Sequence, residues 1–332
     1  MARVAVVFTG GTISMVADPT AGGNVPALDG AAILARSPGL ETIAEVVAVD
    51  LGRTPASHFT PTQLLGIAAT LRDLLAEPAT DGLVVVQGTD TIEETSFLWD
   101  LVLDGPKPVV VTGAMRAASD VGYDGPANLR DAVRVAASPE LRDTGVVVVL
   151  GGSIEPADDV VKTHTSSLTT FRSPNGGSLG RVEQDRVVLF RRRAGRRRVA
   201  TERASERVHL LTAVTGMDGT LVDAAVAADA EGLVVATTGG GNTSPTLLDA
   251  ASRAMERGIP VVLTTRCVGG CAGTAYAFPG GGATWVRAGA VLAGHLSGPK
   301  ARIALALGLG AGLDRGALGA LLADPAPVDH VA

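Results

Sequence analysis

The chain has 332 residues, of which 46% are hydrophobic and only 3% aromatic, and its formal net charge at pH 7 is −6. This length suggests two domains or one large domain, and a net negative charge gives no reason to expect nucleic acid as a partner. No apolar run reaches the roughly 18 residues of a membrane helix, so we expect no membrane contact. The first strand begins too close to Met1 to leave room for a signal peptide, and we expect a soluble, cytoplasmic protein.

The first predicted strand, residues 4–8, ends in a turn that carries hydroxyl groups. This turn, residues 9–14, reads TGGTIS, and its two glycines let backbone amides approach a ligand closely. A hydroxyl on each side of the glycines offers a nucleophile. The spacing is not GxGxxG, so a dinucleotide site is only weakly indicated. The alternative is a tight turn without chemistry.

The next segment, residues 15–30, is rich in Gly, Pro, Asp and Asn and shows no periodicity. A structureless stretch of this length predicts a functional lid or a disordered segment rather than an ordinary connection. A second strand is predicted at 46–49. A helix is predicted at 61–75, with Thr60 before Pro61 as its cap.

The central feature of the chain is the stretch 84–95, VVVQGTDTIEET. A β-branched run that stops at a glycine is typical of a buried parallel strand, which we place at 83–87. Glu93 and Glu94 then open a helix that ends near Leu103. Thr89 and Asp90 should therefore lie at the carboxyl end of a strand, where open α/β sheets bind ligands. The alternative is a simple turn with Thr or Asp as the helix N-cap.

Strands at 109–112 and 145–150, with a helix at 124–135 between them, continue the alternation of strand and helix. This rhythm, with abundant small residues, predicts a doubly wound, mainly parallel sheet in an α/β fold. Lys162 follows in a β-branched environment. It is either an exposed strand lysine or a lysine whose proton affinity is set by its surroundings. His164 is expected to be a hydrogen-bonded polar residue rather than a catalyst.

The second half of the chain predicts a smaller α/β domain. We place the larger N-terminal catalytic domain at 1–190, a linker at 191–207 and the C-terminal domain at 208–332. The basic run 191–198, RRRAGRRR, is expected to be a solvated linker, with an anion-binding patch as the alternative. The predicted elements of this half are strands at 208–214, 233–237 and 260–264, and helices at 218–228, 245–257 and 299–308.

The two cysteines, Cys267 and Cys271, lie four residues apart in a glycine-rich loop. A metal site needs more ligands than cluster there, so we expect no metal. Free thiols are the preferred interpretation and a local disulfide is the alternative.

Four motifs follow one another along the chain: 9–13 (TGGTI), 87–95 (QGTDTIEET), 112–116 (TGAMR) with 124–126 (DGP), and 161–163 (VKT). In this order they resemble the motifs of the bacterial-type L-asparaginases. The resemblance spans nearly the whole chain and implies an amide hydrolase of α/β fold that needs no cofactor. It implies that Thr12 is the nucleophile, and that Thr89, Asp90 and Lys162 form a second catalytic cluster.

The chemistry of these residue types fits that implication. A threonine hydroxyl needs help to lose its proton, and a lysine beside a second threonine can relay or accept it. In the family, the residue at Asp90 also holds the α-ammonium of the substrate. Backbone amides near Gly11, Gly88 and Thr89 would suit a developing oxyanion, each donor contributing roughly 3–4 kcal/mol.

The resemblance also implies further substrate contacts and an assembly. Ser57 is the candidate for the serine that binds the substrate carboxylate. Asn242, after three glycines, matches the asparagine that reaches a neighbouring subunit's site, so we expect a homotetramer built as a dimer of dimers. The alternative for Asn242 is a local cap of the helix that begins at Pro245.

The sequence departs from the family pattern at two places. Residues 15–30 contain no tyrosine, and Val25 lies near where the family often has one. Residues 276–282 contain no acid, although the family often has a glutamate there. These departures keep two alternatives open: an enzyme for glutamine or another small amide, and a catalytically weak or inactive amino-acid-binding protein.

Overall fold

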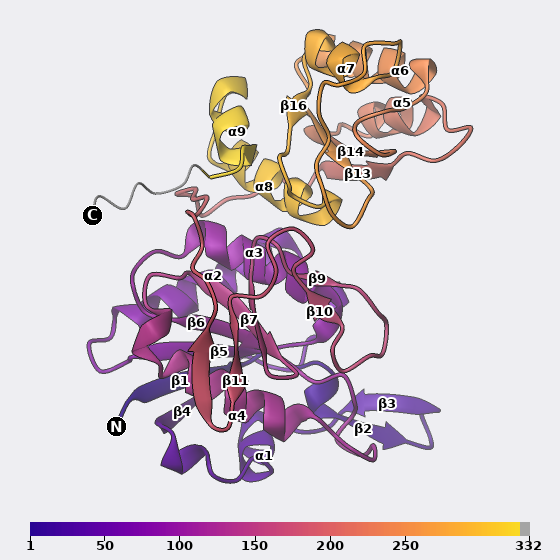
Figure 1. Ribbon diagram of the computed structural model, residues 1–332. Helices are drawn as coiled ribbons and strands as arrows, with labels where there is room; N and C mark the ends of the chain where they lie inside the picture. Colours follow the sequence, from indigo (N-terminus) through magenta and orange to yellow (C-terminus); the bar gives the residue numbers. More distant parts are fainter. Residues whose placement is uncertain (326–332) are drawn as a thin grey trace, which may run out of the picture. The chain divides into compact units, whose positions relative to one another are not determined.

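A computed structural model describes residues 1–325 and divides the chain into two compact units, Met1–Arg193 and a second that begins at Ala194 (Figure 1). Each unit has its own sheet with helices packed against it, mixed in the first unit and wholly parallel in the second. The predicted two-domain α/β architecture is therefore confirmed. The stretch 191–207, where we place the linker, contains neither helix nor strand.

The first unit is built on an eight-stranded sheet with the strand order β12-β11-β8-β7-β6-β5-β1-β4. The strands from β7 to β4 run parallel, as predicted, and β8, β11 and β12 add an antiparallel edge. The bounds are β1 (Arg3–Phe8), β4 (Glu45–Asp50), β5 (Gly82–Val86), β6 (Val109–Thr112), β7 (Val146–Leu150), β8 (Ser153–Pro156), β11 (Gly180–Glu183) and β12 (Arg186–Leu189).

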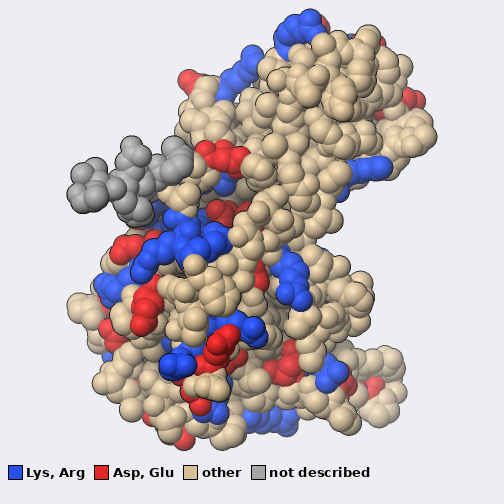
Figure 2. Space-filling model, viewed as in Figure 1, with Lys and Arg blue, Asp and Glu red and all other residues tan. Residues whose placement is uncertain are grey.

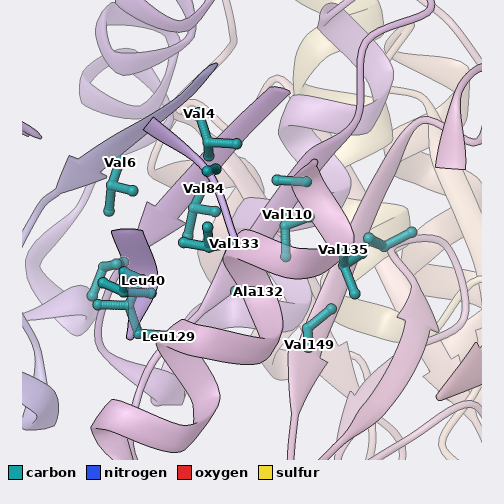
Figure 3. Close-up of a cluster of buried hydrophobic side chains, with 14 of the residues drawn as sticks. Val4, Val6, Leu40, Val84, Val110, Leu129, Ala132, Val133, Val135 and Val149 are labelled. Carbon is teal, nitrogen blue, oxygen red and sulfur yellow. The ribbon is translucent and has the colours of Figure 1, made fainter. Parts of the chain in front are cut away.

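Helices cover both faces of this sheet (Figure 1). On one face, the alternating residues Val4, Val84 and Val110 pack against Leu129 and Val133 of α4 (Figure 3). Strand side chains alternate between faces, so the other valines of these strands point toward α2 and α3. The helices are α1 (Gly30–Ala35), α2 (Pro61–Ala76), α3 (Ile92–Val102) and α4 (Gly125–Ala136), with short 3-10 turns η2 (Leu40–Thr42) and η5 (Pro139–Leu141).

The second unit is a four-stranded, wholly parallel sheet in the order β13-β14-β15-β16. Leu233, Val235 and Leu263 pack on one face against Leu247 and Trp285. Its visible surface carries few charged side chains (Figure 2). The elements are β13 (Val208–Thr212), α5 (Thr220–Ala227), β14 (Gly232–Thr237), α6 (Pro245–Glu256), β15 (Val261–Thr265), α7 (Gly282–Ala288), β16 (Val291–Leu292), α8 (Gly298–Gly310) and α9 (Arg315–Leu322).

The segment 15–30, expected to be a lid or disordered, forms a β-hairpin instead. Strands β2 (Met15–Asp18) and β3 (Gly23–Pro26) pair in antiparallel fashion. The turn is closed by Asp18, whose Oδ1 accepts hydrogen bonds from the backbone N–H groups of Thr20 and Ala21 at 2.7 and 3.2 Å. These bonds lower the pKa of Asp18. The expectation of a stretch without regular structure was wrong because this side-chain turn is not visible as periodicity, and the role of a lid stays a prediction.

The hairpin β11–β12 was missed for a related reason. Its two-residue turn places Gln184 and Asp185 at positive φ, 46° and 64°, as a two-residue hairpin turn requires. β12 lies at the sheet edge with β11 beside it. β11 alternates no apolar residues, and the apolar run of β12 is only three residues long, Val187–Leu189, so the sequence showed no strand alternation there.

The basic run is not a solvated linker at two of its positions. The Arg193 side chain is only 6% exposed and pairs with Asp100 at 2.8 Å and Asp158 at 2.9 Å. Burial alone would lower the pKa of the Arg193 guanidinium, but the two carboxylates raise it above its ordinary value. In the second unit, Arg197 is also buried and pairs with Asp324 at 2.8 Å. These cations neutralise carboxylates of the chain itself, which argues against an anion-binding patch at these two positions.

Cys267 and Cys271 are free, exposed thiols, so the preferred interpretation is confirmed and the disulfide is not formed. Over residues 1–325, no cluster of His, Cys, Asp and Glu is arranged to hold a metal ion. Within the same residues, no helix combines the length and the apolar character that crossing a membrane requires.

Candidate active site

Two glycine-containing turns meet at the carboxyl ends of β1 and β5. These strands are neighbours, and Phe8 pairs with Val86. Gly11 has φ +98°, and a Cβ placed on it would lie 2.2 Å from the backbone nitrogen of Gly88. Only a glycine fits at such an approach. The turn that contains Thr12 therefore touches the turn that contains Thr89.

Thr12 begins the short 3-10 turn η1 (Thr12–Ser14), which is held on both sides. The backbone N–H and the hydroxyl of Ser14 donate to the Gly11 carbonyl at 2.9 and 2.7 Å. From the loop before α4, the Tyr123 hydroxyl donates to the Ile13 carbonyl at 2.7 Å. Burial raises the pKa of Tyr123 to about 12, while Arg36 opposes this shift. The phenol therefore stays a donor over the neutral pH range.

Lys162 joins the second turn to a separate strand pair. It lies in β9 (Val161–Lys162), which pairs with β10 (Phe171–Arg172). Its Nζ lies 2.9 Å from Thr89 Oγ1 and 2.6 Å from Asp90 Oδ1. The alternative of an exposed strand lysine is wrong, because the lysine side chain is 14% exposed, against 76% for Asp90. The structure thus brings three of the predicted catalytic residues into hydrogen-bond contact.

Thr89 and Asp90 lie in a 3-10 turn, η4 (Thr89–Thr91), that leads into α3. Neither caps the helix, so the prediction of a simple capped turn is wrong. The Thr91 hydroxyl donates instead to the Ala56 carbonyl at 3.2 Å. Within the described residues, the backbone N–H groups of Thr89 and Asp90 donate to no other group of the chain. Such unpaired amides suit a negatively charged oxygen.

A cavity of about 260 Å³ opens beside this cluster, lined by Asp90, Lys162, Thr163, His164 and Thr165. His164 Nδ1 accepts the backbone N–H groups of Ser166 and Ser167 at 3.0 and 3.1 Å. The neutral ring therefore carries its proton on Nε2. His164 is a hydrogen-bonded polar residue, as expected.

Ser57, the candidate carboxylate ligand, is exposed in the turn η3 (Ala56–His58) and forms no hydrogen bond within the described residues. The neighbouring Ala56 is buried, and its methyl group would lie 2.9 Å from a Cβ placed on Gly88. The structure therefore brings Ala56, rather than Ser57, against the Gly88 turn.

Asn242 lies in the second unit, in the glycine-rich turn that follows β14. Its backbone carbonyl accepts from the N–H and the hydroxyl of Thr238 at 3.0 and 2.8 Å. Its side-chain Oδ1 is buried and has no hydrogen-bond partner among the described residues. The alternative of a local cap is wrong, because Ser244 caps α6 through the N–H of Leu247 at 3.2 Å.

Sequence reasoning missed two residues that hold the cluster. Glu93 Oε2 accepts the backbone N–H of Lys162 at 2.8 Å, whereas the sequence suggested only a favourable charge at a helix start. Tyr123 holds the turn after Thr12, and its position just before the motif at 124–126 was the one available signal. Neither contact follows from local periodicity, because the partners are far apart in sequence.

Two family models match the chain in succession. The model described as Asparaginase, N-terminal covers residues 3–195, and the model described as Glutaminase/Asparaginase C-terminal domain covers residues 207–322. The chain belongs to the asparaginase family. Together these matches extend over most of the chain and separate at the stretch that we predicted to be a linker.

Individual members of the asparaginase family are similar over nearly their full length. A probable L-asparaginase of Deinococcus radiodurans is 37% identical over 317 residues, which is 94% of each chain. An L-asparaginase of Bacillus licheniformis is 32% identical over 308 residues, covering 92% of this chain and 94% of the relative. The crystal structure of a probable cytoplasmic L-asparaginase from Campylobacter jejuni superposes with a TM-score of 0.86 at 27% identity, covering 97% of this chain and 99% of that chain.

Proposed function

We propose that this chain hydrolyses L-asparagine to L-aspartate and ammonia through an acyl-threonine intermediate on Thr12. The observation that carries the proposal is the position of Lys162, whose Nζ contacts both Thr89 and Asp90 at 2.9 and 2.6 Å. Membership of the asparaginase family and the contact between the two glycine turns support it.

The reaction would proceed in two halves. Thr12 Oγ attacks the amide carbon, and its proton passes through the Thr89 hydroxyl toward the Lys162 amine. The carbon–nitrogen bond then breaks, and the leaving nitrogen takes up a proton to depart as ammonia. Water attacks the remaining ester in the second half, releasing aspartate and restoring the Thr12 hydroxyl.

The substrate would be held by its charged groups and its carbonyl oxygen. The exposed carboxylate of Asp90 suits the α-ammonium group. Backbone amides near Gly11, Gly88 and Thr89 would stabilise the developing oxyanion, each contributing roughly 3–4 kcal/mol. No metal or other cofactor is required for these steps.

Ammonia release from asparagine by the wild-type chain, Thr12→Ala and Thr12→Ser tests the proposal. We expect Thr12→Ala to lose turnover and Thr12→Ser to retain part of it, because serine keeps a hydroxyl at the same place. Undiminished turnover of Thr12→Ala would remove Thr12 from the mechanism. Calorimetric binding of aspartate by a wild-type chain without turnover would instead support an amino-acid-binding protein.

A second candidate is the hydrolysis of glutamine or another small amide. It is favoured by Ala56, whose methyl group lies against the Gly88 turn while the Ser57 hydroxyl is exposed. A methyl group offers a substrate carboxylate no hydrogen bond. The ratio of kcat/KM for asparagine to that for glutamine and for simple amides separates the two candidates.

We also propose a homotetramer arranged as a dimer of dimers, in which Asn242 reaches a neighbouring chain. The buried Oδ1 of Asn242, which has no partner among the described residues, supports this, because such an oxygen without a donor costs about 1–3 kcal/mol. Light scattering after size-exclusion chromatography tests the assembly.

The cytoplasmic location and the domain limits 1–190 and 208–332 remain further proposals. The similarity to the probable cytoplasmic L-asparaginase of Campylobacter jejuni supports the location, and cell fractionation tests it. Limited proteolysis within 191–207 tests the limits.

A further inference from the structure

We propose that Glu93 is a positioning residue for Lys162, fixing the lysine backbone to the same helix start that carries Thr89 and Asp90. The contact that carries this inference is the hydrogen bond of 2.8 Å from the Lys162 backbone N–H to Glu93 Oε2. The inference rests on the proposed function of the cluster and adds a residue that acts through Lys162.

The strand that carries Lys162 has little support of its own. β9 contains two residues and pairs only with β10, outside the eight-stranded sheet. A two-stranded pair is marginally stable by itself. The Thr163 N–H bonds to Thr170 across this pair, so the preceding N–H, that of Lys162, faces the open side. Glu93 is the acceptor on that open side.

Glu93 holds one end of Lys162 while Thr89 and Asp90 hold the other. The Nζ contacts to these two residues are 2.9 and 2.6 Å, and the backbone contact is 2.8 Å. All three partners lie within one short stretch at the start of α3. Both ends of the lysine are therefore bonded to residues 89–93, and this sets the distance between its amine and the Thr89 hydroxyl.

The helix α3, which begins within this stretch, is firmly packed. The α3 side chains of Ile92, Phe97 and Trp99 are fully buried, and the Trp99 indole N–H donates to the Leu64 carbonyl of α2 at 3.1 Å. A bond from this rigid helix start to the backbone of β9 keeps the strand from sliding. The Glu93 carboxylate accepts that bond from the Lys162 N–H.

A favourable charge at the helix start is another role of Glu93. Glu94 lies in the same first turn and has that role as well. The two glutamates therefore form a matched pair, in which the bond from Glu93 to the Lys162 backbone distinguishes them.

The test compares Glu93→Ala, Glu93→Gln and Glu93→Asp with Glu94→Ala, using the full chain and amide turnover. We expect Glu93→Ala to lower kcat about 100-fold with little change in KM, since a displacement of about 1 Å can cost this much. Glu93→Gln retains an oxygen acceptor and should recover most of kcat. Glu94→Ala should resemble the wild type.

Two results would overturn the proposal: an unchanged kcat in Glu93→Ala, or Glu93→Gln as impaired as Glu93→Ala, which would assign the effect to charge. If Glu93→Ala does not fold, Glu93→Asp decides, because its shorter side chain draws the acceptor back from Lys162. A wild-type kcat in Glu93→Asp would then contradict the proposal.

A readout independent of activity separates this inference from the proposed function. Hydrogen–deuterium exchange of peptides covering residues 158–165 should rise in Glu93→Ala and stay unchanged in Glu94→Ala. If the wild type hydrolyses no amide but the exchange differs in this way, the positioning role stands and the proposed function fails. Equal exchange in both variants would overturn the positioning role.

Discussion

Both units place a glycine-rich turn after a buried parallel strand, but the polar side chains on these turns differ in whether the described part of the same chain supplies their partners. After β5, the hydroxyl of Thr89 and the carboxylate of Asp90 both contact Lys162. After β14, the side-chain oxygen of Asn242 is buried without a partner among residues 1–325. Other elements donate to the second turn as well, since the Thr265 hydroxyl bonds to the Gly239 carbonyl at 2.7 Å. The difference therefore lies in whether a donor reaches the polar side chain that the turn carries.

This difference shows that a glycine turn at a strand end is a scaffold and not yet a site. In the first unit, β9 brings an amine to the turn from 73 residues away in sequence. In the second unit, no residue of the described chain donates to the Asn242 Oδ1. We therefore expect the two turns to respond differently to substitution.

The largest effect should come from removing the Lys162 amine that contacts the turn after β5. We expect Lys162→Met to lower kcat by about 10³-fold, the range of a lost proton-transfer group. Lys107→Met is the matched control, because Lys107 bonds to the carbonyls of Leu75 and Glu77 and not to the cluster. Equal kcat values for the two variants would contradict the role of Lys162.

Loss of a buried ion pair in the first unit should lower stability more than loss of an exposed ion pair in the second unit. Arg193→Met removes the buried Arg193 cation from Asp100 and Asp158, which we expect to cost about 3–5 kcal/mol of unfolding free energy. Arg253→Met in the second unit breaks a pair with Asp223 in which both side chains are over half exposed, and should cost under about 1 kcal/mol.

Urea unfolding followed by tryptophan fluorescence measures both variants. Trp99 lies in the first unit and Trp285 in the second, and both are fully buried. A Trp285→Phe background leaves Trp99 to report on Arg193→Met, and a Trp99→Phe background leaves Trp285 to report on Arg253→Met. Similar losses in the two arginine variants would show that burial of Arg193 does not set its contribution.

Substitution of Asn242, in the turn after β14, should affect the association of chains. If a neighbouring chain supplies the donor for Asn242, Asn242→Ala should lower kcat/KM or weaken association about tenfold, equivalent to roughly 1.4 kcal/mol. Light scattering over a dilution series and steady-state kinetics measure this. A variant that assembles and turns over like the wild type would mean that the turn has no external partner.

The burial of Tyr123, whose hydroxyl donates to the Ile13 carbonyl in the turn after β1, should appear as a pH dependence of stability. The pKa of Tyr123 is raised to about 12 by burial, from an unfolded value of about 10. Its contribution to stability is therefore complete below pH 10 and is lost as the pH rises toward 12. We expect the fall in Tm over this range to be smaller in Tyr123→Phe, with Tyr276→Phe as the matched control. A fall equal to that of the wild type would exclude Tyr123 as its source.

The smallest effect should come from Ala56, whose methyl group lies against the Gly88 turn. Ala56→Ser places a hydroxyl against Gly88, and one added hydrogen bond to a substrate carboxylate contributes about 0.5–1.5 kcal/mol. We expect kcat/KM for asparagine to rise severalfold, while Ser57→Ala changes nothing. A loss of activity in Ser57→Ala would return the carboxylate contact to Ser57.

Much of the scaffold was predictable because its signals are local. The β-branched runs at β1, β5 and β6 predicted strands of nearly the observed bounds. Thr60 caps α2 as expected, with Gln63 completing a capping box. The glycine turns were predicted at strand ends, and parallel strands bring such ends to one edge of a sheet. Thr12, Thr89 and Asp90 were named from motifs in these turns and Lys162 from the motif at 161–163, through the resemblance to the family.

Contacts between distant segments were decided only by the tertiary structure. The sequence by itself determined strands, helix starts and glycine turns, because these depend on residues within a few positions of one another. It did not determine that Arg193 is buried between two carboxylates, that Ala56 rather than Ser57 faces Gly88, or that Glu93 holds Lys162. Those outcomes depend on which side chains packing brings together, and that is set by the whole fold.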